Sequence, residues 1–198
     1  MPHPLLAPIR AVVGPVHLDE ARIVSAFRRR ELARGEAWLR EGEVCRKLAF
    51  VESGGLRHTR ADDTDGGREL TRWAAVAGQY TTSFPSFTQG RPSDDRITAT
   101  APTVVYELDR DAWQRLREAY PPLQSFWVQT LEYLLVCFED RVWSLIAGDA
   151  ESRYRYMVAR YPDFLLDLPQ HYLADMLGIA PRHLSRIRAK LAAGPAAP

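Results

Sequence analysis

The chain has 198 residues, which is enough for one large domain or two small ones. Hydrophobic residues make up 46% of it, so we expect a sizeable core and exclude general disorder. The formal net charge of +1 gives no global sign of a nucleic-acid partner, so any such sign must be local. Cys45 and Cys137 stand far apart, in no CxxC or Cys/His spacing, which argues against disulfides, zinc and iron–sulfur clusters.

The sequence carries no pattern of a membrane span or an export signal. Charged residues interrupt the apolar stretches well before the length that a bilayer requires. Prolines at positions 2, 4 and 8 break the N-terminal segment, which also lacks the basic start and apolar run of a signal peptide. We therefore expect a cytoplasmic protein that does not bind membranes.

Residues 18–110 have the pattern of a β-domain. An amphipathic stretch at 17–30 predicts a helix near its start. Short apolar segments then recur roughly every ten residues between turn signals, as in β-sandwiches and small jelly-roll barrels. The polar cluster at 62–67 predicts a hairpin, because Asp and Gly tolerate positive φ. The predicted strands are 37–39, 47–52, 56–60, 70–76, 97–100 and 104–108.

Residues 111–148 change to a helical period, with apolar side chains three or four positions apart. Pro121 and Pro122 favour the start of a long helix, and Gly148 favours its end. Its apolar face has two candidate partners, the β-domain of the same chain or the same helix of a second copy across a two-fold axis. We predict a homodimer through 122–147. The predicted seam is Trp127, Leu131, Leu134, Phe138, Val142 and Leu145.

Residues 149–191 predict short helices, of which the last two form a helix-turn-helix. Ala174 permits the close approach of the two helices, and Gly178 supplies the positive φ that the turn requires. Leu184 and Ile187 would anchor the second helix from its inner face. That helix begins after Ala180, where the usual Ser or Thr cap is missing.

The second helix of this motif is basic, which makes it a candidate DNA-reading element. Arg182 and Arg186 share one helix face, and arginine forms bidentate hydrogen bonds with guanine in the major groove. Arg188 and Lys190 lie later in the helix and suit phosphates, as do the backbone amides near Gln170. The predicted DNA contacts are Gln170, Arg182, His183, Ser185, Arg186, Arg188 and Lys190.

The order of these parts resembles the Crp/Fnr regulators, from about residue 18 to residue 191. The stretches that carry the resemblance are FVESGGLR at 50–57, SRY at 152–154, YLADMLGI at 172–179 and LSRI at 184–187. They are most similar to the branch of the family common in Bacteroidetes-type bacteria.

The resemblance implies an α+β chain in three parts. These are a cyclic-nucleotide-binding-like jelly-roll barrel at 18–110, a dimerisation helix region at 111–148, and a helix-turn-helix of winged-helix type at 149–191. The chain leaves room for little or no wing after the last helix. The family pattern further implies a palindromic promoter site on double-stranded DNA, with Arg182, His183 and Arg186 at the base-reading positions.

The stretch at 78–87 departs from the family's phosphate-binding cassette. Gln79 stands where a glutamate would hold the ribose hydroxyl, and Arg96 is followed by Ile97 rather than by Ser or Thr. We therefore expect no response to cyclic AMP and leave the effector unidentified. Phenylalanines in this stretch would either make the pocket apolar or fill it. The candidate effector pocket is Gln79, Tyr80, Phe84, Phe87 and Arg96.

Other functions fit the sequence less well. A cupin-type metal enzyme needs several histidines inside the barrel, and only His58 lies among the predicted strands. The carboxylate pairs at 62–63 and 94–95 sit in turn-like segments, where Asp is structurally favoured. We therefore predict no enzyme, no metal and no cofactor. The alternative function is a ligand-sensing or protein-interaction barrel with a degenerate DNA-binding head, against which the basic, acid-free C-terminal helix argues.

Overall fold

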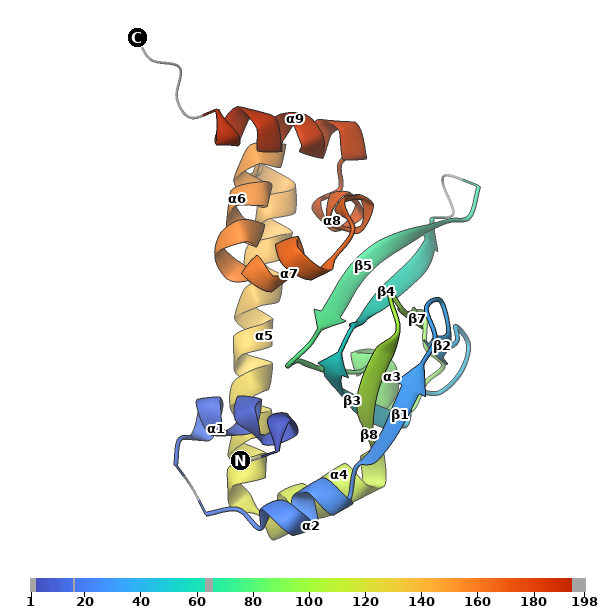
Figure 1. Cartoon of the computed structure of the whole chain (residues 1–198), viewed down its shortest axis with the longest axis vertical. Coiled ribbons are helices and arrows are strands. Elements are labelled where there is room, and N and C mark those ends of the chain that lie inside the picture. Colours follow the sequence, from blue (N-terminus) through green and yellow to red (C-terminus); the bar gives the residue numbers. More distant parts are fainter. Residues whose placement is uncertain (1–2, 16, 63–65, 194–198) are drawn as a thin grey trace.

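The computed structural model describes residues 3–15, 17–62 and 66–193. Its strands form two four-stranded antiparallel sheets, in the orders β1-β8-β3-β6 and β2-β7-β4-β5 (Figure 1). Among the described residues, the predicted β-domain therefore consists of two sheets that do not close into one barrel. The strands are β1 (Arg28–Leu32), β2 (Ala37–Leu39), β3 (Lys47–Ser53), β4 (Gly55–Asp62), β5 (Arg68–Val76), β6 (Tyr80–Thr81), β7 (Arg96–Ala99) and β8 (Thr103–Asp109).

Helices lie along one side of these sheets and below them, and they extend well beyond the strands (Figure 1). The long helix α5 has α1, α2 and α4 near its N-terminal end, and α6 to α9 gather at its C-terminal end. We call α6 to α9 the head. The helices are the 3-10 turn η1 (Pro4–Leu6), α1 (Ala7–Val13), α2 (Glu20–Ser25), α3 (Phe84–Gln89), α4 (Arg110–Ala119), α5 (Pro121–Ala147), α6 (Ala150–Arg160), α7 (Pro162–Asp167), α8 (Gln170–Leu177) and α9 (Pro181–Ala192).

Strand β3 shows how the sequence builds two cores from one sheet. Successive side chains of a strand point to opposite faces. Leu48 and Phe50 accordingly pack into a cluster with the N-terminal helices, α4 and α5. Ala49 and Val51 point the other way, into a second cluster formed by side chains from both sheets. The two sheets thus pack face to face, and helices cover the outer face of the first sheet.

The strands predicted from alternation are present, whereas the helix predicted at 17–30 is wrong over its second half. Helix α2 ends at Ser25, and Arg28–Leu32 forms strand β1 paired with β8. Tertiary contacts override the local pattern here, since the buried carboxylate of Glu107 accepts hydrogen bonds from Arg28 at 2.8 Å and from Arg30 at 3.2 Å. The predicted 62–67 hairpin joins the antiparallel strands β4 and β5, although residues 63–65 lie outside the described part of the chain.

The N-terminal segment belongs to the first core, although the domain range predicted from the sequence starts at residue 18. Leu5, Leu6 and Ile9 are fully buried against α5, β3 and their neighbours. The hydroxyl of Tyr80 donates a hydrogen bond to the carbonyl oxygen of Leu5 at 2.6 Å. This segment therefore closes the helix-covered face of the first sheet.

The predicted ends of the long helix are confirmed. Helix α5 starts at Pro121 and ends at Gly148, where a Cβ atom would lie 2.6 Å from the carbonyl oxygen of Ser144. The side chain of Asp149 then caps α6 by accepting a hydrogen bond from the Ser152 amide at 2.7 Å. In the part of the chain that the structure describes, no helix combines the length and apolar character needed to cross a bilayer.

The packing of the N-terminal segment predicts a large effect of Leu5→Ala. Truncating this fully buried side chain should lower the free energy of unfolding by about 2–5 kcal/mol, as cavity-forming substitutions do. Val12→Ala, at an exposed position of α1, should change it by less than about 0.5 kcal/mol. Urea unfolding of both variants checks this, and equal effects would show that the segment contributes no core.

Candidate nucleic-acid interface

Helices α8 and α9 form the predicted helix-turn-helix. Gly178 ends α8 with a φ of 65°, in the left-handed region that favours glycine. Ala174 is fully buried, and its carbonyl accepts a hydrogen bond from the amide of Ile179 at 3.0 Å. Leu184 and Ile187 are buried in the core of the head and fix the inner face of α9. The remaining positions of the first three turns of α9 are exposed.

The exposed face of α9 is cationic and lies at one extremity of the molecule. Helix α9 lies across the C-terminal end of α5, above the other helices of the head (Figure 1). Arg182, His183, Arg186 and Arg188 are all exposed. Within the described ranges, none of these four side chains forms an ion pair, so the positive charge of the three arginines is available to an external partner.

Gln170 and Ser185, two of the predicted contacts, are joined to each other. The Gln170 side-chain amide donates hydrogen bonds to Ser185 Oγ at 2.6 Å and to the carbonyl oxygen of Pro181 at 3.3 Å. No side chain caps α9 at Ala180, as the sequence predicts. Gln170 therefore braces the first turn of α9 from the neighbouring helix, a role that spacing within one helix could not reveal.

Lys190 differs from the other basic residues of α9. Its ammonium group lies 2.7 Å from a carboxylate oxygen of Glu151 on α6. Hydrogen bonds from Lys190 and Arg155 lower the pKa of Glu151. The sequence from Met176 onward contains no acidic residue, and Glu151 comes close to Lys190 only in the folded chain. Lys190 thus has less free charge to offer than Arg188.

The predicted effector residues separate into two groups. Tyr80, Phe84 and Phe87 belong to one aromatic set that reaches helix α5. Tyr80 contacts Phe126 with ring centroids 5.8 Å apart, and burial raises the pKa of the Tyr80 hydroxyl. Phe84 and Phe87 both contact Trp127, at 6.1 and 6.2 Å.

The two polar members of the predicted effector set lie elsewhere. The side-chain oxygen of Gln79 accepts a hydrogen bond from the amide of Val76 at 3.3 Å and so closes its own turn. Arg96 is exposed and lies 3.4 Å from a carboxylate oxygen of Glu69. The structure therefore does not bring Arg96 to the aromatic set.

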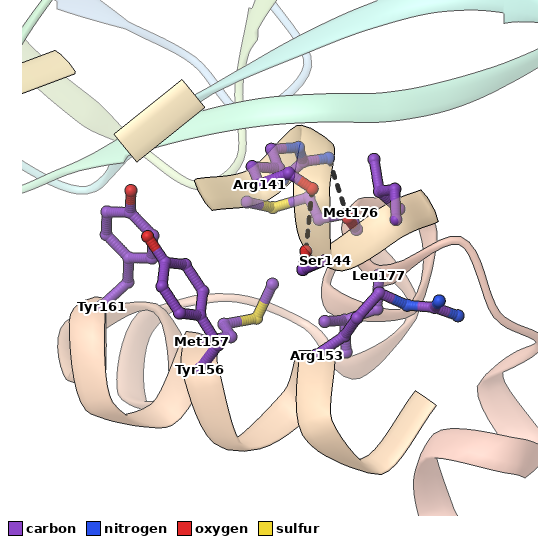
Figure 2. Close-up of a pocket in the computed structure, with 9 residues that line it drawn as sticks. Arg141, Ser144, Arg153, Tyr156, Met157, Tyr161, Met176 and Leu177 are labelled. Atoms are coloured by element: carbon purple, nitrogen blue, oxygen red, sulfur yellow. Dashed lines mark hydrogen bonds between the residues drawn. The ribbon is translucent and has the colours of Figure 1, made fainter. Parts of the chain in front are cut away.

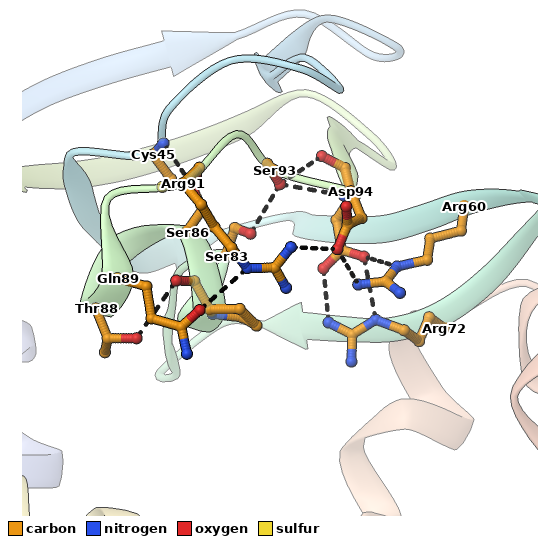
Figure 3. Close-up of polar contacts among 12 residues, drawn as sticks. Cys45, Arg60, Arg72, Ser83, Ser86, Thr88, Gln89, Arg91, Ser93 and Asp94 are labelled. Atoms are coloured by element: carbon orange, nitrogen blue, oxygen red, sulfur yellow. Dashed lines mark hydrogen bonds and ion pairs between the residues drawn. The ribbon is translucent and has the colours of Figure 1, made fainter.

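A charged cluster beside α3 was not expected from the sequence (Figure 3). Asp95 is fully buried and accepts hydrogen bonds from Arg60 Nε at 2.5 Å and from Arg72 Nη2 at 2.6 Å. Burial tends to raise the pKa of Asp95, but the nearby His58, Arg72 and Arg60 outweigh it and hold this pKa well below its usual range. Asp94 and Asp95 both lie in the loop before β7, as the sequence predicts, but only Asp94 is exposed, whereas Asp95 is buried among its ion pairs. An arginine within the apolar strand β5 was the available signal.

Comparison with known proteins places the fold in a recognisable class. No protein-family model and no curated protein sequence matches the chain. Among solved structures, a CooA mutant from Carboxydothermus hydrogenoformans has a TM-score of 0.71 and 19% identity, over 94% of this chain and 84% of that one. The catabolite activator protein of Thermus thermophilus has a TM-score of 0.59 and 21% identity, over 94% and 87%.

A third similar structure is the c-di-GMP-responsive global regulator CLP of Xanthomonas campestris, with a TM-score of 0.63 and 19% identity, over 87% of this chain and 90% of that one. At these identities the likeness is one of fold. The chain has the fold of the catabolite activator protein, an α/β arrangement with antiparallel sheets, and the likeness spans both the sheets and the head.

The buried ion pairs of Asp95 predict a pH-dependent stability. Asp95→Asn should lower the free energy of unfolding by about 2 kcal/mol near neutral pH, the size expected for hydrogen bonds to a charged group. Because folding depresses the pKa of Asp95, its stabilisation is complete above the unfolded-state pKa of about 3.9 and is lost as the pH falls below it.

We therefore expect the difference in free energy of unfolding between the wild type and Asp95→Asn to become smaller below about pH 4. Urea unfolding between about pH 7 and pH 3 measures this difference. The exposed neighbour gives the control, since Asp94→Asn should stay within about 0.5 kcal/mol of the wild type throughout. A gap for Asp95→Asn that does not change with pH would contradict ion pairing as its cause.

Proposed function

We propose that the chain is a dimeric, sequence-specific DNA-binding transcription regulator of the Crp/Fnr type that acts in the cytoplasm. The observation that carries this proposal is the exposed face of α9, whose arginines form no ion pair among the described residues, on a helix-turn-helix whose inner side chains are buried. The fold shared with the catabolite activator protein supports it. In this proposal the chain belongs to the Bacteroidetes-type branch, which the resemblance of the stretches at 50–57 and 172–179 supports. Its sensor, dimerisation and DNA-binding parts are 18–110, 111–148 and 149–191.

In this proposal the residues of α9 have different roles. Arg182, His183 and Arg186 face outward and read base edges in the major groove of a palindromic site. Arg188, unpaired and later in the helix, contacts a phosphate. Lys190 contributes less to binding than its charge suggests, because Glu151 holds its ammonium group.

The exposed apolar face of α5 favours a second copy of the chain as its partner. The N-terminal part of α5 packs on its own domain, where Trp127 contacts Trp113 at 5.7 Å. Beyond it, large apolar side chains are exposed, with Ile146 73% and Trp143 69% accessible. The exposed positions Val128, Leu135, Phe138, Val142 and Leu145 follow the heptad spacing of a two-stranded coiled coil.

This stripe differs from the predicted seam in its first half. Trp127 belongs to the aromatic set of the same chain, and Leu134 is half-buried. In this proposal both candidate partners of the helix apply, each to a different part of it. The chain's own domain covers the first turns, and its head covers one side of the later turns through contacts such as that of Arg141 with Met176. A second copy covers the apolar positions that remain exposed. A dimer of this kind would present two α9 helices, as a palindromic site requires.

The effector region supports the expectation that cyclic AMP is not the signal. The side chain of Gln79 accepts a hydrogen bond from the backbone of its own turn, and Arg96 forms an ion pair with Glu69. The nearby arginines Arg60 and Arg72 already share the carboxylate of Asp95, which leaves them little charge for a phosphate.

DNA binding is tested by measuring the affinity of the full chain for a duplex selected from random DNA and for a random duplex, over a range of salt. We expect affinity to fall steeply with salt. Arg186→Ala should lower the preference for the selected site by about 1–3 kcal/mol. Arg188→Ala should weaken binding to both duplexes by the same factor, and it should reduce the steepness of log affinity against log salt concentration by about one unit.

Arg115→Ala, at an exposed position of α4 far along the chain from the head, is the control and should leave binding unchanged. Absence of binding to the random pool at low salt would refute the regulator and favour the alternative, a ligand-sensing or protein-interaction protein with a degenerate head.

Dimerisation is tested by sedimentation of the full chain. The wild type should sediment as a dimer and Leu135→Glu as a monomer, because the substitution places a charge in the apolar stripe. Gln129→Glu adds the same charge at an exposed polar position of α5 and should leave the dimer intact. A monomeric wild type, or a Leu135→Glu variant that still dimerises, would contradict the proposed interface.

A further inference from the structure

The head packs on strand β5 of the same chain. Ala74 and Val76 of β5 are fully buried in one apolar cluster with side chains of α6 to α9. Trp73 lies against the head as well, with its ring 5.3 Å from that of Tyr161 and 5.6 Å from that of Phe164. The orientation of the helix-turn-helix is therefore set by contact with the sheet and not only by the end of α5 (Figure 1).

A polar contact fixes the register of this packing. Asp175 Oδ2 accepts hydrogen bonds from the backbone amide of Thr71 at 3.2 Å and from its hydroxyl at 3.1 Å. Arg68 lies 3.6 Å from the other carboxylate oxygen. One turn earlier in α8, the guanidinium group of Arg57 stacks on the ring of Tyr172 at 4.4 Å.

The last turn of α8 is also held from α5. The side chain of Arg141 donates a hydrogen bond to the carbonyl oxygen of Met176 at 2.8 Å, and the two residues line a small pocket of about 20 Å³ between α5 and the head (Figure 2). Helix α8 is thus bound from two sides, by β5 and by α5.

Asp175 is unsuited to its own helix, which points to a role outside it. It lies in the last turn of α8, where a negative charge opposes the helix dipole. The helix-turn-helix itself is built from Ala174, Gly178 and the buried apolar residues of α9. The hydrogen bonds of the Asp175 side chain go to β5, about a hundred residues earlier in the chain.

The strand is shaped for this contact. The ladder between β4 and β5 pairs His58 with Trp73 and Thr59 with Thr71, so Arg72 has no partner and forms a β-bulge. A bulge re-aims the side chains next to it. Arg72 binds Asp95 beside α3, while Thr71 and Trp73 on either side of it both contact the head.

We propose that Asp175 and Thr71 are positioning residues for DNA recognition, which hold the helix-turn-helix on β5 so that α9 presents its arginines at the end of the molecule. This inference rests on the proposed function. According to it, the contacts of Asp175 and Thr71 favour one orientation of the head relative to β5. Removing them lowers the fraction of molecules that can bind DNA and weakens the apparent affinity in proportion.

The test compares variants in binding to the selected duplex. Asp175→Ala should weaken binding about tenfold, a typical coupling between two sites. Loss of a negative charge alone would strengthen it, so the two effects have opposite signs. Asp167→Ala removes the same charge at an exposed position of the head and measures that electrostatic effect. Thr71→Val, which keeps the shape of the side chain, should weaken binding by a smaller factor.

Two further readouts separate positioning from damage to the head. The preference for the selected over the random duplex should be unchanged in Asp175→Ala, because the base-reading residues are intact. The double variant Thr71→Val/Asp175→Ala should bind as Asp175→Ala does, because both changes remove the same contact. A lost preference would show that the helix-turn-helix itself is disrupted and would overturn the inference.

The inference is also overturned if Asp175→Ala binds as tightly as Asp167→Ala or more tightly, which would make the contact neutral or inhibitory. In that case the wild type still binds the selected duplex, and the proposed function stands. A wild type that binds no DNA refutes the proposed function and this inference together, so the two failures are distinguishable.

Discussion

The structure depends most on the burial of strand β5 from two sides. Ala75 completes the core between the two sheets, whereas Ala74 and Val76 pack against the helices of the head. The small side chain of Ala74 lets the head approach the strand closely. The bulge at Arg72 then allows one short segment to bind Asp95 beside α3 and Asp175 in the head. The relation between the sheets and the helix-turn-helix follows from this strand, and with it the direction in which α9 points.

The charge of the molecule is distributed in keeping with this arrangement. Acidic and basic groups around the sheets neutralise one another, as at Glu107 and Asp95, and the net charge of the chain is only +1. On α9, by contrast, Arg182, Arg186 and Arg188 have no counterion among the described residues. A protein that binds nucleic acid needs such a local excess rather than a high global charge. The exposed apolar stripe of α5 is the surface through which we propose that two such helices are brought together.

Much of this could be predicted from local patterns. Alternation located strands such as β3 and β5, prolines and glycines set the ends of α5 and the turn at Gly178, and spacing along α9 separated buried from exposed positions. Contacts between distant residues were beyond those patterns. Strand β1 looked helical because its partner Glu107 is far along the chain. The ion pairs of Asp95 and Lys190 were missed for the same reason, because their partners Arg72 and Glu151 are near them only in the fold.

The central claim is that two copies of α9, joined through α5, read DNA as a symmetric pair. Selection of binding sites from a pool of random duplexes by the full chain tests it most directly. The account predicts enrichment of an inverted repeat whose half-sites are centred about one helical turn, or 10–10.5 base pairs, apart or a multiple of that. Enrichment of a single unrepeated element, or of no sequence at all, would contradict it.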